Sequence, residues 1–259
     1  MIKLSILSEN VAGKNCLAEH GLSFLIEADK TVLFDTGASD LFIQNAKKMD
    51  IDLDAIDSIV LSHGHDDHTG GLQFLKNKKL ICHPDVFLGH YRKTDSTPLG
   101  LQMTVKDAKQ NFDLTISRKP VQISKKIWFL GEIPRLNDFE AKETAFKFDD
   151  GTDDFVMDDT GIAIIGNDGL IVVSGCAHSG ICNMVDYAMK VPGAEKVHAV
   201  IGGFHLKKND EVTQRTISHF KSLNVNYVIP SHCTMLPALA AFYNEWNFVQ
   251  LKTGNVLRI

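Results

Sequence analysis

The most constraining feature of the sequence is a ligand-rich segment that directly follows the short apolar run Ser58–Leu61. It reads Ser62-His63-Gly64-His65-Asp66-Asp67-His68-Thr69-Gly70-Gly71. Imidazole and carboxylate groups are ligands for zinc, iron and manganese. The alternative is a solvated polar turn, but such crowded histidines need a cation or low pH to offset the cost of packing polar groups together. The segment therefore predicts a metal site at the end of a buried strand, where α/β sheets place their ligands.

The pattern along the rest of the chain favours an α/β layer fold, because strand-like and helical stretches alternate. We predict these strands, with the numbers of their first and last residues: 22–28, 31–34, 58–61, 79–82, 127–130, 161–165, 170–174, 197–201 and 225–229. We predict helices near 40–49, 72–76, 181–191, 213–223 and 237–244. Residues 1–259 are expected to form one domain, in which the segment of about 85–159 is an elaboration over one face.

The composition and charge of the chain limit the kinds of molecule that we expect it to bind. Among 259 residues, 27 lysines and arginines against 32 aspartates and glutamates give a net charge of −5, so nothing favours nucleic acid or an anionic membrane. No apolar run approaches the length of a membrane span. The first ten residues are typical of a strand rather than a secretory leader. Five scattered cysteines favour reduced thiols, so we expect a cytoplasmic protein whose partner is a small molecule.

The spacing His63-x-His65-x-Asp67-His68 resembles the metal motif of the metallo-β-lactamase superfamily, and Phe34-Asp35-Thr36-Gly37 resembles its early aspartate–glycine turn. The resemblance extends in order over essentially the whole chain. It implies a four-layer αββα sandwich with a dinuclear metal site at the edge between two sheets. It also implies two divalent ions: zinc in the first place, with iron or manganese as alternatives.

Further motifs are similar to one branch of this superfamily, which includes the archaeal dihydropterin–ribofuranosylaminobenzene-phosphate synthase and many uncharacterised bacterial proteins. These motifs are Glu19-His20-Gly21-Leu22-Ser23, Ser174-Gly175-Cys176-Ala177-His178-Ser179-Gly180, Gly202-Gly203-Phe204-His205-Leu206 and Ser231-His232-Cys233-Thr234. The resemblance does not transfer a substrate to every member of the branch.

The superfamily motif implies that His63 and His65 bind a first metal, and that Asp67 and His68 bind a second. His178 is our choice to complete the first site, with a helix-capping role as the alternative. His232 follows a predicted strand where the last histidine of the superfamily occurs, and we expect it to be a ligand.

The chain departs from the superfamily where most members carry a bridging aspartate, because the matching turn here reads Gly175-Cys176. Cys176, Asp158 or Asp159 could bridge the metals, or a water molecule could do so alone. A small buried cysteine is the simpler interpretation of Cys176. We expect Asp35 to anchor the metal loop by hydrogen bonds behind the ligands.

Several other residues have less defined roles. His205 is a candidate general acid, phosphate contact or additional ligand, and a hydrogen-bonded histidine at a strand end is the alternative. His20 and Cys233 are candidates for substrate binding. We assign the remaining histidines to the surface or to ordinary packing: His83, His90, His198 and His219.

These features predict a metal-dependent hydrolase in which activated water attacks a phosphoester or ester-like small molecule, with Asp67 or His205 managing the proton. One alternative is a dihydropterin-linked transferase that releases diphosphate. A second is a metal-binding sensor without turnover.

Overall fold

We describe a computed structural model that covers residues 1–259. Two large β-sheets form its centre. The first has the strand order β16-β1-β2-β3-β4-β5-β7, with bounds Val256–Arg258, Lys3–Ser8, Ser23–Glu27, Thr31–Phe34, Ser58–Val60, Lys79–Cys82 and Asp113–Ile116. The second has the order β15-β14-β13-β12-β9-β8, with bounds Tyr227–Ser231, Val197–Gly203, Leu170–Ser174, Gly161–Ile165, Ile127–Phe129 and Val121–Gln122.

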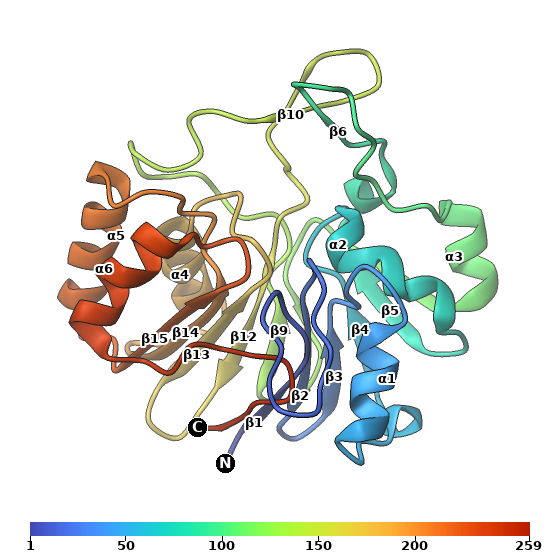
Figure 1. Ribbon diagram of the computed structural model, residues 1–259, viewed down its shortest axis with the longest axis horizontal. Coiled ribbons are helices and arrows are strands. Elements are labelled where there is room, and N and C mark those ends of the chain that lie inside the picture. The colour runs from blue at the N-terminus through green and yellow to red at the C-terminus, as the bar shows by residue number, and fades with distance from the viewer.

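Helices cover the outer face of each sheet, as Figure 1 shows. The helices α1, α2 and α3 accompany the first sheet and have the bounds Leu41–Lys48, Asp66–Thr69 and Val105–Asn111. The helices α4, α5 and α6 cover the second sheet and have the bounds Ile181–Lys190, Glu211–Ser222 and Leu236–Trp246. Three short turns of 3-10 helix occur at Leu53–Ala55, Gly70–Phe74 and Pro84–Phe87. The arrangement is the αββα sandwich that the family resemblance implies.

The alternation of apolar side chains along the strands explains the four layers. Along β13, Val172 packs against the helices, whereas Ile171 and Val173 pack between the two sheets. The same layer between the sheets receives Phe24 and Phe34 from the first sheet. Because successive side chains of a strand point to opposite faces, strands that are apolar at every position must be covered on both sides.

The direction of the strands positions the functional loops. The strands β3, β4, β5 and β7 run parallel to one another, and so do β13, β14 and β15. Their carboxyl ends meet at one edge of the sandwich, and the loops that follow β3, β4, β13, β14 and β15 therefore gather there.

The middle segment is more integrated into the fold than the sequence suggests. Part of residues 85–159 forms α3 and β7, which extend the first sheet, while β8 and β9 extend the second. Another part forms a small sheet of β11 (Asp153–Asp154), β10 (Phe146–Lys147) and β6 (Tyr91–Arg92). In Figure 1, β6 and β10 lie above the edge where the functional loops meet.

Two predicted elements differ from the structure. The expected helix at 72–76 is only the 3-10 turn Gly70–Phe74, because two leading glycines and a strand that begins at Lys79 leave too few residues for an α-helix. The expected strand at 225–229 is displaced to Tyr227–Ser231, since the Val225 N–H closes the end of α5 by donating to the Phe220 carbonyl. None of the helices combines the length and apolar character needed to cross a lipid bilayer.

Candidate metal centre

His63, His65 and His178 form a first group of converging side chains. The loop after β4 supplies His63 and His65, and the loop after β13 supplies His178. His63 Nε2 lies 3.0 Å from His65 Nδ1. The ring centroid of His178 lies 4.9 Å from that of His63 and 5.0 Å from that of His65. One ligand atom from each residue falls within 4.8 Å of the other two, which is a suitable spacing for three ligands of one metal ion.

Asp67, His68 and His232 form the second group. His68 Nε2 lies 3.1 Å from His232 Nε2. Asp67 Oδ2 lies 3.2 Å from His232 Nε2 and 3.6 Å from His68 Nε2. All six residues that the sequence predicts as metal ligands are therefore brought together in two adjacent groups.

Hydrogen bonds behind the histidines fix which nitrogen faces each group. His63 Nδ1 lies 2.9 Å from Ser62 Oγ, and His68 Nδ1 lies 2.7 Å from Asp35 Oδ2. His232 Nδ1 lies 3.0 Å from Asn10 Oδ1. With each outer partner accepting a hydrogen bond from Nδ1–H, Nε2 is the nitrogen directed into the centre. Nε2 of His178 is buried and has no hydrogen-bond partner, so the residues present fit a cation.

Asp35, which we expect from the sequence to anchor the metal loop by hydrogen bonds, also connects the two groups. It is fully buried at the end of β3, where its φ of +60° lies in the left-handed region. Its Oδ1 accepts the Ser62 N–H at 2.7 Å, and its Oδ2 accepts the Ser62 Oγ–H at 2.7 Å and the His68 Nδ1–H at 2.7 Å. One carboxylate therefore orients His68 directly and His63 through Ser62.

The pKa shifts of the histidines also differ between the two groups. Burial holds the pKa of His63 and His178 well below its ordinary value and lowers the pKa of His65 to about 3, so these imidazoles are neutral ligands. Burial also disfavours charge at His68, but attraction to Asp67 and Asp35 outweighs it and raises the pKa of His68 to about 9. A cation at His68 Nε2 would replace that proton.

The three candidate bridging residues occupy different places. Asp159 accepts the Ser179 N–H at 2.9 Å, which steadies the loop that carries His178. Asp158 accepts the Gly64 N–H at 2.6 Å between His63 and His65. Burial raises the pKa of both carboxyl groups, that of Asp158 to about 6. These two carboxyl groups therefore support the loops that carry the histidines.

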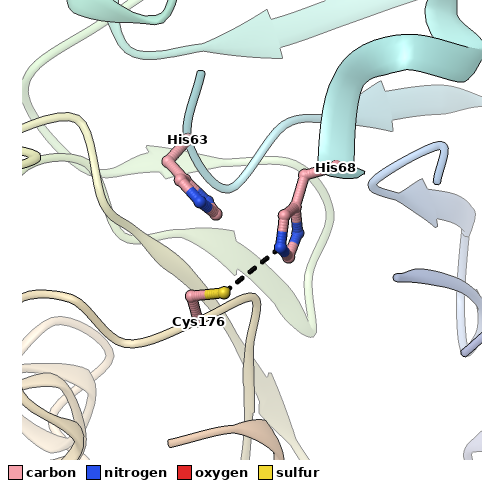
Figure 2. A group of neighbouring side chains, drawn as sticks. All are labelled: His63, His68 and Cys176. Carbon is pink, nitrogen blue, oxygen red and sulfur yellow. Dashed lines mark hydrogen bonds between the residues drawn. The ribbon is translucent and has the colours of Figure 1, made fainter. Parts of the chain in front are cut away.

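Cys176 is the bridging candidate that reaches the ligands. Figure 2 shows its side chain directed toward those of His63 and His68. The Cys176 Sγ lies 3.2 Å from His68 Nε2, and the thiol is buried. This position between the two groups is compatible with a ligand as well as with a buried structural thiol.

A cavity of about 380 Å³ borders the centre. His178 and His205 line its inner end, and the segment Phe139–Phe146 and the residues Phe204–Leu206 form much of its wall. The Phe146 ring lies 4.6 Å from the His65 ring between centroids. Such a size and a lining of both apolar and polar side chains suit a small-molecule ligand.

His20 and Cys233, the two residues predicted to bind substrate, both lie outside the lining of this cavity. His20 is mostly exposed, stacks on His232 at 5.3 Å between ring centroids, and places Nε2 3.4 Å from Asp67 Oδ2. Cys233 is buried behind His205, whose backbone N–H donates to the Cys233 Sγ at 3.3 Å. Neither His20 nor Cys233 lines the cavity, so its geometry does not support their predicted role in substrate binding.

Several supporting residues carry no signal in the sequence. Glu9 is buried and accepts the His232 N–H at 2.8 Å, which holds His232 at its left-handed φ of +53°. Asn10 lies beside it and accepts from His232 Nδ1. His90 is buried, its ring lies 5.6 Å from that of His65, and its Nδ1 lies 2.6 Å from Asp154 Oδ2. His90, predicted to be in ordinary packing or at the surface, thus packs against the centre itself.

Comparison with known proteins agrees with this geometry. The family model described as metallo-beta-lactamase superfamily matches residues 18–85. A 7,8-dihydropterin-6-methyl-4-(beta-D-ribofuranosyl)-aminobenzene-5'-phosphate synthase of Methanocaldococcus jannaschii is 37% identical over 99% of this chain and 96% of its own length. An uncharacterized protein of the same archaeon is 34% identical over 99% of this chain and 100% of its own. A solved structure described as a metal-dependent hydrolase of the beta-lactamase superfamily has a TM-score of 0.89 and 27% identity, covering 100% of this chain and 99% of that one.

Proposed function

Because the chain belongs to the metallo-beta-lactamase superfamily, we propose that it is a metal-dependent hydrolase that uses water to cleave a phosphoester or ester-like bond in a small molecule. The observation that supports this most strongly is the convergence of six ligand side chains beside a cavity large enough for such a substrate. The similar structure described as a metal-dependent hydrolase adds support for the class of reaction.

His63, His65 and His178 would hold one divalent ion, and Asp67, His68 and His232 would hold the other. Bound divalent cations supply Lewis acidity, which activates water near neutral pH and offsets negative charge on a substrate oxygen. Zinc is the first candidate because neutral imidazole and carboxylate are its common ligands, and iron or manganese would accept the same set.

The protein's own groups orient the water molecule and the substrate. Burial disfavours the charged form of Asp67, but the neighbouring His68 and His232 outweigh it and hold the pKa of Asp67 below its ordinary range. Asp67 therefore stays an anion that can bind a cation and orient a water molecule by accepting its hydrogen bond. The phenylalanines of the cavity wall exclude bulk water from the substrate, and Lys142 on the same wall offers a cation for an anionic group.

A second candidate is a dihydropterin-linked transferase that releases diphosphate, and the 37% identity with the synthase over nearly both full lengths favours it. The same electrophilic centre serves hydrolysis and diphosphate departure, so the ligand set alone does not separate the two reactions. The uncharacterized archaeal protein, which is almost as similar, shows that comparable identity accompanies more than one gene product in a single organism.

One assay separates these candidates. Metal-loaded protein is given a dihydropterin methyl diphosphate with and without the ribofuranosylaminobenzene phosphate acceptor, and released diphosphate and joined product are measured. Release without acceptor supports the hydrolase. Acceptor-dependent release with a joined product establishes the transferase instead. Absence of turnover here and on a panel of phosphodiesters and esters, with both metals bound, would contradict both and favour a sensor.

A further inference from the structure

Three neighbouring strands place sulfur and nitrogen ligands together beside the two metal positions. The last paired residues of β13, β14 and β15 are Ser174, Gly203 and Ser231. Cys176, His205 and Cys233 each stand two residues beyond these positions. Since the strands are parallel, the three side chains emerge at the same edge of the sheet.

The local backbone allows the two thiols to approach each other. Gly203 lies between them, and a Cβ atom added there would stand 2.7 Å from the Cys233 Sγ and 3.2 Å from the Cys176 Cα. Any larger residue at Gly203 would therefore occupy the space between the two cysteines. His205 has a φ of +51°, a left-handed conformation that is uncommon for a residue with a side chain.

One ligand atom from each of Cys176, His205 and Cys233 lies within 4.8 Å of the other two. In tetrahedral coordination, Zn–S bonds of about 2.3 Å place two sulfurs about 3.8 Å apart. This separation is within the 4.8 Å that the ligand atoms of the three residues span. Nδ1 of His205 is buried and has no hydrogen-bond partner. His205 offers one of its two ring nitrogens to this group, and a buried imidazole nitrogen without a partner is a polar group that a cation would satisfy.

We propose that Cys176, His205 and Cys233 form a third metal position, selective for a soft cation such as Zn²⁺. Two thiolates and one imidazole are a softer set than either histidine-rich group, and thiolates bind zinc more readily than manganese. His205 also lines the cavity, which leaves a route for the ion and space for a fourth ligand. In this account His205 is a ligand rather than the general acid, and the position does not depend on which reaction the enzyme catalyses.

Cobalt titration of the metal-free full chain tests the proposal, because Co²⁺ bound to thiolate gives a charge-transfer absorption. Metal per chain is measured in parallel by mass spectrometry. The wild-type protein should bind three equivalents and show the thiolate absorption. Cys233→Ser should lose one equivalent together with the thiolate absorption, since both come from the same position. Cys176→Ser should also lose one equivalent while retaining two metals.

Cys16→Ser is the matched control, since it removes a thiol that belongs to none of the metal-ligand groups and should change neither count nor absorption. A Cys233→Ser protein with wild-type metal content and absorption would overturn the proposal. So would absorption that depends on Cys176 alone, which would make Cys176 a ligand of the second metal only. If circular dichroism shows that Cys233→Ser does not fold, the rate of alkylation of Cys233 is measured in the wild-type protein with and without zinc. Bound zinc should slow this reaction, and an unchanged rate overturns the proposal.

Discussion

Asp35→Asn should weaken the second metal position far more than the first. Asparagine can keep the acceptor for the Ser62 N–H through Oδ1, but its Nδ2 would face the Ser62 hydroxyl and His68 Nδ1, which both donate to Asp35 in the wild type. His68 then loses the acceptor that keeps its proton on Nδ1. The favoured tautomer would carry the proton on Nε2, the nitrogen that faces Asp67 and His232.

The magnitude follows from these contacts. Loss of an outer partner of a ligating histidine typically lowers metal affinity about 10- to 100-fold. The substitution also replaces two buried hydrogen bonds to a carboxylate, and each contributes about 1.5–3 kcal/mol, so the free energy of unfolding should fall by on the order of 3 kcal/mol. His63 contacts Asp35 only through Ser62, so the first position should change less.

Competition with a chromophoric chelator measures both stepwise affinities, and urea unfolding measures stability. Asp57→Asn is the control, because Asp57 pairs with Lys30 on the surface and should leave both affinities unchanged. Equal affinities for both metals in Asp35→Asn and wild type would refute the orienting role of Asp35. An equal loss at both positions would refute the division into two groups.

Three further predictions concern two single residues and the bound metals. His63→Ala should lose the first metal and turnover together, and full metal content by mass spectrometry would contradict its role as a ligand. Burial raises the pKa of Asp158 in the folded protein to about 6 from an ordinary 3.8. The free energy of unfolding of the wild type should therefore fall by up to about 3 kcal/mol as pH rises from below 4 to above 6, because the buried carboxyl group must ionise. Asp158→Asn has no such group and should not show this fall. Urea unfolding of Asp158→Asn should lack that decline, and parallel profiles for the two proteins would refute it. Chelation should lower the thermal midpoint, because metal that binds only the folded state stabilises it by an amount that grows with the logarithm of the free metal concentration. An unchanged midpoint after complete metal removal would exclude preferential binding to the folded state.

The central ligands could be predicted from the sequence because their signals are local. His63, His65, Asp67 and His68 share one short loop after a buried strand, and His178 and His232 each follow an apolar run. The layered fold follows from the same runs, since strands that are apolar on both faces require cover on both sides.

The outer partners could not be predicted, because topology rather than spacing brings them to the site. Asn10 meets His232 across 222 positions of sequence, and Glu9 contacts the same residue from the same loop. Cys233 approaches Cys176 because the parallel strands β13, β14 and β15 end at the same edge of the sheet, with Gly203 between the thiols. Pairing of distant strands, which no local pattern encodes, decides these contacts.

The most direct measurement is anomalous X-ray diffraction from crystals of the zinc-loaded protein, with data collected on both sides of the zinc absorption edge. We predict one anomalous peak among His63, His65 and His178, a separate peak among Asp67, His68 and His232, and, at the proposed additional position, a third among Cys176, His205 and Cys233. Anomalous density absent from both groups in protein that carries zinc would contradict the assignment of this cluster as the metal centre.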